Sequence, residues 1–269
     1  MKKLTVFCAA ACLAASAAAQ NHPDLHEVLD RQKGRNLIEI PKGTYTLDVR
    51  SNGPYKFHNL TDVHINGNGS TVICNNQEQA FSFYNCVRVE LRDLTIDYDP
   101  LCFTQGEITA VAEDGSWFDV RIDEGYPVTG LAANRVQFYD PQTRLLKRNS
   151  ITTYTSNYSA LKQLGHNLFR AVKNGTWSAG EQVGDLVVMD VKTDKPNAGV
   201  HTVMLNKCYN TKLENVTVYG SNTFSFFEKE GYANEYRNCV VDRGPMPQGI
   251  RPRLRSGNAD GIHSSQARK

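Results

Sequence analysis

The chain has 269 residues, 40% of them hydrophobic and 22% charged, and a formal net charge of +2. This near balance of charge gives no reason to expect nucleic acid or an anionic membrane as a partner. The length suits one large β domain or two smaller domains. Seven cysteines occur without a Cys-x-x-Cys pair, so this common metal-binding motif is absent from the sequence.

Residues 1–19 have the pattern of a secretory signal peptide. Lys2 and Lys3 precede the apolar run Leu4–Ala15, and small residues lead up to Ala19. We expect cleavage after Ala19 and a secreted or periplasmic protein. The apolar run is shorter than the roughly 20 residues of a membrane-spanning helix, so no membrane span is expected. Acylation of Cys12, as in a lipoprotein, is a weaker alternative.

Residues 20–104 are predicted to hold an N-terminal cap and the first coils of a repeated structure. Pro23–Lys33 predicts one short helix with its leucines on one face, which would cover the open end of a stack of strands. Leu37–Tyr45 then predicts a strand, a Pro-Lys-Gly turn and a second strand.

A short unit of alternating aliphatic residues followed by Asn or Asp recurs along the chain. Leu213 and Tyr236 are 23 residues apart, an earlier copy places Leu91 at the position of Leu213, and Ile65 precedes Leu91 by 26 residues. Periods of roughly 20–50 residues indicate stacked repeats. Because each repeat offers a short strand and a turn, we predict an all-β fold, a right-handed parallel β-helix.

The repeat aligns certain side chains in columns. Asp93, Asn215 and Asn238 share one column, where a ladder of side chains would satisfy backbone groups at a turn. Cys86 and Cys208 share another column and are expected to be interior. The disulfide state is left open for the five cysteines beyond the signal peptide, which are Cys74, Cys86, Cys102, Cys208 and Cys239.

Residues 105–195 interrupt the repeat with strands of another kind. Trp117–Ile122 and Arg135–Tyr139 alternate polar and apolar residues and lie between tight-turn signals, which predicts antiparallel hairpins. We expect an inserted antiparallel barrel or sandwich, with degenerate coils of the repeat as the alternative. The repeat resumes in residues 196–269 and stops without a capping element, so we expect an incomplete β-helix, the N-terminal part of a longer protein, which could be inactive alone.

Three stretches together resemble a known group of enzymes: Asp97–Gly106, Trp117–Ile122 and Asn258–His263. They are similar to secreted β-helix glycosidases of Bacteroidetes, and most of all to glycoside hydrolase family 110, the exo-acting α-1,3-galactosidases. The resemblance implies an inverting, metal-independent hydrolysis of terminal α-galactosides. It therefore implies a glycan or oligosaccharide substrate, no metal and no cofactor.

Asp260 is the candidate catalytic residue. Its Gly-Asn-Ala-Asp-Gly turn is similar to the Asn-Thr-Asp-Gly motif of polygalacturonases, whose Asp is catalytic. An inverting glycosidase needs a second carboxyl group about 6.5–9.5 Å away. Neighbouring parallel strands are about 4.8 Å apart, so we expect that partner one or two repeats away, largely beyond Lys269. Asp242 could supply it, although a turn residue paired with Arg243 is the simpler interpretation.

The candidate substrate-binding residues are His263, Asp242, Arg243 and Arg255. His263 would bind a sugar hydroxyl or adjust the acidity of Asp260, although a histidine at a strand end is more often an ordinary hydrogen-bonded neighbour. Arg251, Arg253 and Arg255 alternate, so they would share one face of a strand. They would line the entrance for an acidic or hydroxyl-rich glycan, or form a charged edge that blocks aggregation.

Two other classes of function stay open. A calcium-dependent polysaccharide lyase similar to pectate lyases could use Asp97 and Asp99 as oxygen ligands, although a turn explains these residues better. A non-catalytic glycan-binding protein would share the fold without the chemistry. The oligomeric state is not predicted.

Overall fold

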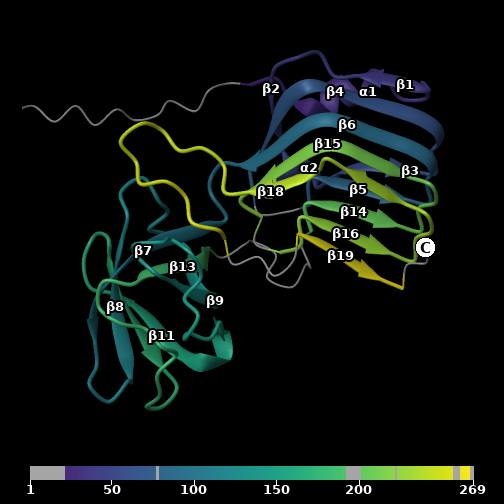
Figure 1. Ribbon diagram of the computed structural model, residues 1–269. Coiled ribbons are helices and arrows are strands. Elements are labelled where there is room, and N and C mark those ends of the chain that lie inside the picture. The colour runs from purple at the N-terminus through teal and green to yellow at the C-terminus, as the bar shows by residue number, and fades with distance from the viewer. Residues whose placement is uncertain (1–21, 77–78, 192–200, 222, 257–260, 267–269) are drawn as a thin grey trace, which may run out of the picture.

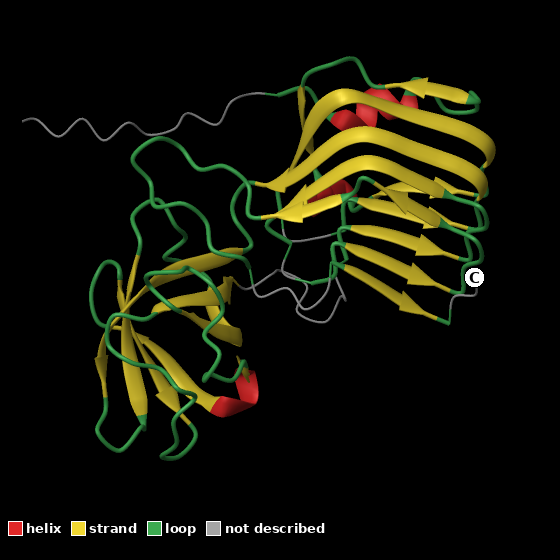
Figure 2. Cartoon of the chain, viewed as in Figure 1, coloured by secondary structure: helices red, strands yellow, loops and turns green. Residues whose placement is uncertain are grey.

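The computed structural model describes residues 22–76, 79–191, 201–221, 223–256 and 261–266. The predicted signal peptide and Asp260 lie outside them. Within these residues the chain is all-β, as predicted, with two parallel sheets and one antiparallel sheet (Figures 1 and 2).

The first parallel sheet has the strand order β1-β4-β6-β15-β17, with β2 paired to β4 and β18 paired to β15. Its strands are β1 (Leu37–Glu39), β2 (Thr44–Leu47), β4 (Thr61–Cys74), β6 (Val87–Tyr98), β15 (Lys212–Tyr219), β17 (Glu235–Arg237) and β18 (Val240–Asp242). Ile65 lies opposite Leu91, Leu91 opposite Leu213, and Leu213 opposite Tyr236. The alignment predicted from the repeat is therefore the register of this sheet.

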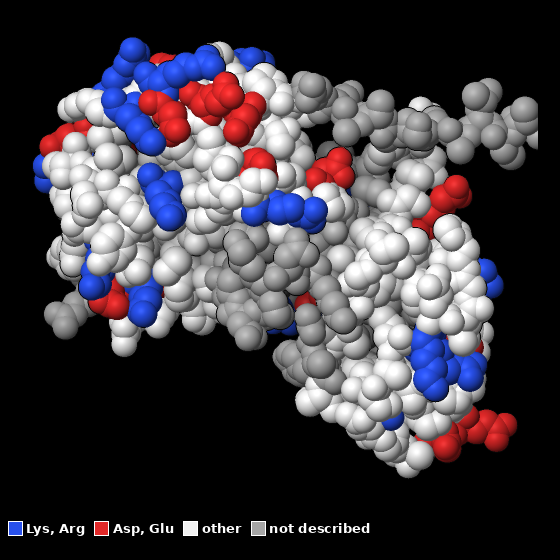
Figure 3. Space-filling model, turned by 180° about the vertical axis from the view of Figure 1, so that it is seen from behind, with Lys and Arg blue, Asp and Glu red and all other residues white. Residues whose placement is uncertain are grey.

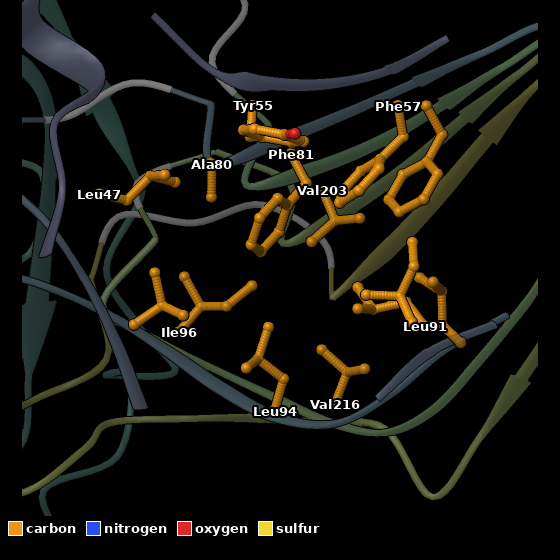
Figure 4. Close-up of a cluster of buried hydrophobic side chains, with 14 of the residues drawn as sticks. Leu47, Tyr55, Phe57, Ala80, Phe81, Leu91, Leu94, Ile96, Val203 and Val216 are labelled. Carbon is orange, nitrogen blue, oxygen red and sulfur yellow. The ribbon is translucent and has the colours of Figure 1, made fainter. Parts of the chain in front are cut away.

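The second parallel sheet has the order β19-β16-β14-β5-β3. Its strands are β3 (Tyr55–His58), β5 (Phe81–Tyr84), β14 (Val203–Asn206), β16 (Phe226–Lys229) and β19 (Ile262–Ser265). The chain passes alternately through the two parallel sheets, and their inward side chains form one buried core. Figure 4 shows Phe57, Phe81 and Val203 from the second sheet facing Leu91 and Val216 from the first.

A polar ladder runs along one turn of the first sheet. Asp93, Asn215 and Asn238 have φ angles of 57°, 54° and 51°, a left-handed conformation that Asn and Asp tolerate. Asn215 Nδ2 donates to Asp93 Oδ1 over 2.8 Å, and Asn238 Nδ2 donates to Asn215 Oδ1 over 3.3 Å. The predicted column of side chains is therefore hydrogen-bonded along its length.

Two short helices lie in the N-terminal part. In α1 (Leu25–Asp30), the Asp24 side chain accepts a hydrogen bond from the first turn, and both leucines are fully buried in the shared core. The helix thus packs on the core, as its apolar face predicted. The sequence analysis missed α2 (Val49–Asn52), a single turn capped by Asp48. Among the described residues, no helix is long and apolar enough to cross a membrane.

The outer face of the first parallel sheet carries paired charges. Arg88 Nε lies 2.6 Å from Asp62 Oδ1 on the neighbouring strand, and Lys212 Nζ lies 3.5 Å from Glu90 Oε1. Figure 3 shows basic and acidic side chains side by side over this part of the molecule. The local mixing of signs agrees with the small net charge of the chain.

The antiparallel sheet has the order β10-β9-β13-β7-β8-β12-β11 and a separate apolar core. Its strands are β7 (Phe103–Val111), β8 (Trp117–Ile122), β9 (Leu131–Tyr139), β10 (Thr153–Tyr154), β11 (Tyr158–Gln163), β12 (Leu168–Lys173) and β13 (Leu186–Val191), with a 3-10 turn η1 (Thr155–Asn157). Every strand pair in it is antiparallel. The alternative of degenerate coils in this region is therefore wrong.

Candidate functional site

The candidate site lies at the junction between the parallel sheets and the antiparallel sheet. One side of the parallel sheets faces the antiparallel sheet (Figure 1). Strands of the first parallel sheet end on this side, and strands of the second parallel sheet begin there. Residues 243–256, here called the strap, leave β18, run over the antiparallel sheet and return before β19. The strap itself contains the candidates Arg243 and Arg255. Asp242 precedes it at the end of β18, and His263 follows it in β19.

Hydrogen bonds from the antiparallel sheet fix the strap backbone. The fully buried Gln105 of β7 donates from Nε2 to the Pro252 carbonyl over 3.1 Å and accepts the Leu254 N–H at Oε1 over 2.6 Å. Tyr139 of β9 donates its hydroxyl to the Arg255 carbonyl over 2.9 Å. A buried polar group without a hydrogen-bond partner destabilises the folded protein. These contacts therefore hold the strap in one path.

A buried ion pair fixes the strap to the first parallel sheet. Arg253 Nη1 lies 2.7 Å from Asp97 Oδ1, and both side chains are about nine-tenths buried. The same carboxylate oxygen accepts the Tyr98 N–H over 2.8 Å, and Arg253 also donates to the Arg243 carbonyl over 3.3 Å. Asp97 is thus engaged by a guanidinium, which does not fit the proposed calcium role.

The prediction that Arg251, Arg253 and Arg255 share one strand face is wrong. Residues 251–256 are not a strand, and Arg253 is buried whereas Arg251 and Arg255 are exposed. The reason is the distant carboxylate of Asp97, which offers Arg253 a buried partner. Within the ranges that the structure describes, no three His, Cys, Asp or Glu side chains gather as metal ligands do.

The structure brings Arg243 and Arg255 together around one tyrosine. Burial raises the pKa of Tyr139 to about 12, and the charges of Arg255 and Arg243 oppose that rise. Arg243 Nη2 also donates to the Arg144 carbonyl over 3.3 Å. Asp242 is exposed at the end of β18, and its Oδ1 accepts the backbone N–H of Arg243 over 2.7 Å.

His263 belongs to a stack of four rings on the second parallel sheet. Its ring centroid lies 4.1 Å from that of Phe224 at an interplanar angle of 5°, and His201 covers Phe224 at 4.9 Å and 8°. Phe227 lies 4.2 Å from His201. Burial, and to a lesser extent the neighbouring His263, lowers the pKa of His201 to about 4. The sequence analysis missed this stack, although His201 and Phe224 have the 23-residue spacing of the repeat.

Asp190 is a second residue that the sequence analysis missed. It lies near the end of β13 opposite Phe103, is 9% exposed, and its Oδ1 has no hydrogen-bond partner among the described residues. Burial raises its pKa to about 7, and the charge of Arg135 only partly opposes this. A carboxyl group that keeps its proton near neutral pH can serve as a general acid. The only signal in the sequence is one acidic residue in the apolar segment Leu186–Val191.

Comparison with known proteins adds no name to these residues. No protein-family model matches the chain, and no curated protein matches it significantly. The geometry and chemistry of the junction are therefore the basis for inferring a function.

Proposed function

We propose that this protein is a secreted glycoside hydrolase that acts on terminal α-galactosides of glycans with inversion, and that its parallel sheets form a right-handed parallel β-helix. The observation that supports this most is Asp190. An inverting glycosidase needs one carboxyl group that is protonated at the working pH and a second that is ionised. A buried carboxyl with a pKa of about 7, whose Oδ1 has no hydrogen-bond partner among the described residues, suits the first role.

The proposal divides the chemistry between two carboxyl groups. Asp190 donates its proton to the glycosidic oxygen as the bond to the anomeric carbon breaks. Asp260, the sequence-based candidate, accepts a proton from the water that attacks the opposite face of the sugar. Among the described residues that precede and follow Asp260, Ser256 donates its hydroxyl to the Ser221 carbonyl, and the Gly261 carbonyl accepts the Phe226 N–H over 3.0 Å.

The other predicted residues take substrate-holding roles in this proposal. Arg243 and Arg255 lie on the strap that crosses the junction, where guanidinium groups can donate to sugar hydroxyls. The ring stack that includes His263 offers an apolar surface with an imidazole edge, a combination suited to a sugar ring. Asp242, at the end of β18, is given no substrate-holding role.

A panel of 4-nitrophenyl α- and β-glycosides tests the proposal. We expect turnover of the α-galactoside, release of β-galactose as the first product by NMR, and no loss of rate with a chelator. Asp260→Asn should abolish turnover, whereas Asp62→Asn, which removes an exposed carboxylate on the parallel sheet, should not. A chelator-sensitive rate with an unsaturated product would instead establish a lyase. Binding of galactosides without any turnover would establish a binding protein.

A further inference from the structure

A pocket of about 260 Å³ opens on the antiparallel sheet, formed by residues to which the hydrolytic proposal gives no role. Its polar lining comes from β7, β8, two turns and the strap, and includes Glu107, Arg121, Asp123, Glu124, Asn167 and Arg251. The strap thus contributes to the pocket through Arg251 and to the junction through Arg253, two residues further along the chain.

The polar groups of this pocket are held in place before any ligand arrives. Arg251 Nη1 lies 3.0 Å from Asp123 Oδ1, and Arg251 Nη2 lies 3.5 Å from Glu107 Oε2. The other oxygen of Asp123 accepts Gln105 Nε2 over 2.9 Å, and Gln105 is fully buried. Burial raises the pKa of Asp123 even beside this arginine. A preformed set of this kind lowers the entropy lost when a ligand binds.

The lining selects a class of ligand. Its three carboxylates and two guanidiniums offer both acceptors and donors, and most of the charge is compensated. A neutral polyol fits this pattern, because each hydroxyl can donate to a carboxylate and accept from a guanidinium. The volume is below the roughly 300 Å³ of sites for drug-sized ligands, which suits one sugar ring.

We propose that this pocket is an accessory saccharide-binding site that holds a single neutral sugar ring apart from the hydrolytic centre. The choice of a sugar among neutral polyols rests on the proposed function. Binding here would anchor a glycan on the antiparallel sheet while another part of it reaches the junction. It would also steady the strap, because Arg251 and Arg253 belong to one hydrogen-bonded segment.

NMR titration of the ¹⁵N-labelled protein with methyl α-galactoside tests the site without requiring turnover. We expect saturable shifts of the amide signals of Glu107, Asp123 and Arg251, with a Kd in the millimolar range that is usual for one sugar ring. Glu124→Gln replaces a charged acceptor by a weaker neutral one and should weaken binding about tenfold. It should leave the melting temperature unchanged because Glu124 is exposed.

The matched control is Arg31→Ala, which removes an exposed ion pair on α1 and should leave both the shifts and the Kd unchanged. Absence of saturable shifts at the pocket, or an unchanged Kd in Glu124→Gln, would overturn the proposal. So would tighter binding of phosphate or methylammonium than of the sugar. Binding at the pocket in a protein that hydrolyses no glycoside would uphold this site and reject the hydrolase.

Discussion

Arg253 and Asp97 are 156 residues apart in the sequence and form a buried ion pair, with Arg253 Nη1 2.7 Å from Asp97 Oδ1. The pair joins the strap to the end of β6, immediately before the chain enters the antiparallel sheet. It therefore fixes the relative positions of the residues that we assign to the junction.

Removal of this arginine should be costly. In Arg253→Met the Asp97 carboxylate stays buried without its partner, so we expect a loss of about 3–5 kcal/mol in the free energy of unfolding, measured by urea denaturation. Arg88→Met removes the exposed Arg88–Asp62 pair, which solvent screens, and should leave the free energy of unfolding nearly unchanged. Equal losses in the two variants would show that the buried pair has no special role.

The antiparallel sheet should be sensitive to a single methyl group at Gly106. A Cβ atom there would lie 2.2 Å from the Arg121 carbonyl oxygen of β8, and that oxygen belongs to the backbone of a paired strand. We expect Gly106→Ala to lower stability by about 3 kcal/mol or more, the upper range for overpacking. Gly165→Ala, whose Cβ would meet its nearest atom at 3.6 Å, is the matched control and should fold normally.

The ring stack predicts an acid-sensitive stability. The pKa of His201 is about 4 in the folded protein and about 6.5 in the unfolded chain, so the unfolded state binds more protons between these values. Stability should therefore fall as the pH drops from 6.5 to 4. In His201→Phe, which keeps a ring against Phe224, the melting temperature should depend less on pH across this window. An unchanged slope in that variant would contradict the assignment.

Asp190 should make the stability depend on pH in the opposite direction, with stability falling as the pH rises. Its pKa is about 7 in the folded protein and about 3.9 in the unfolded chain, so the folded state binds more protons between them. Its contribution to stability is present below pH 4 and is lost as the pH rises through 7. Asp190→Asn should thus melt at a higher temperature than the wild type at pH 8 and at a similar temperature at pH 4. A variant that is destabilised at pH 8 would show that the ionised carboxylate is well solvated or paired.

The sequence predicted those features that depend on local repetition. The whole antiparallel sheet lies between Leu91 and Leu213 in the sequence. The repeat nevertheless predicts their pairing, because each copy carries the same pattern. Features that depend on distant partners left no local signal. Arg253 resembles its exposed neighbours in the sequence, and only the fold shows that Asp97 buries it.

The candidate site also combines residues that the sequence predicts with residues that only the fold reveals. Arg243 is a candidate as the neighbour of Asp242, and Arg255 as one of three alternating arginines; the structure places both near Tyr139. Asp190 lies 70 residues before Asp260 in a segment that reads as an ordinary strand, so no spacing rule could connect the two. The assignment of Asp260 itself stays a prediction, because this residue lies outside the described ranges.

The most direct test compares two α-galactosides with different leaving groups at several pH values. For an alkyl galactoside, which needs its leaving oxygen protonated, we predict that kcat/KM falls above pH 7 and that Asp190→Asn lowers it by about 10²–10⁴-fold. For a 2,4-dinitrophenyl galactoside, whose leaving group needs no acid, the same variant should keep most of its rate, whereas Asp260→Asn should lose both. Equal rates of Asp190→Asn and the wild type on the alkyl galactoside would contradict the account.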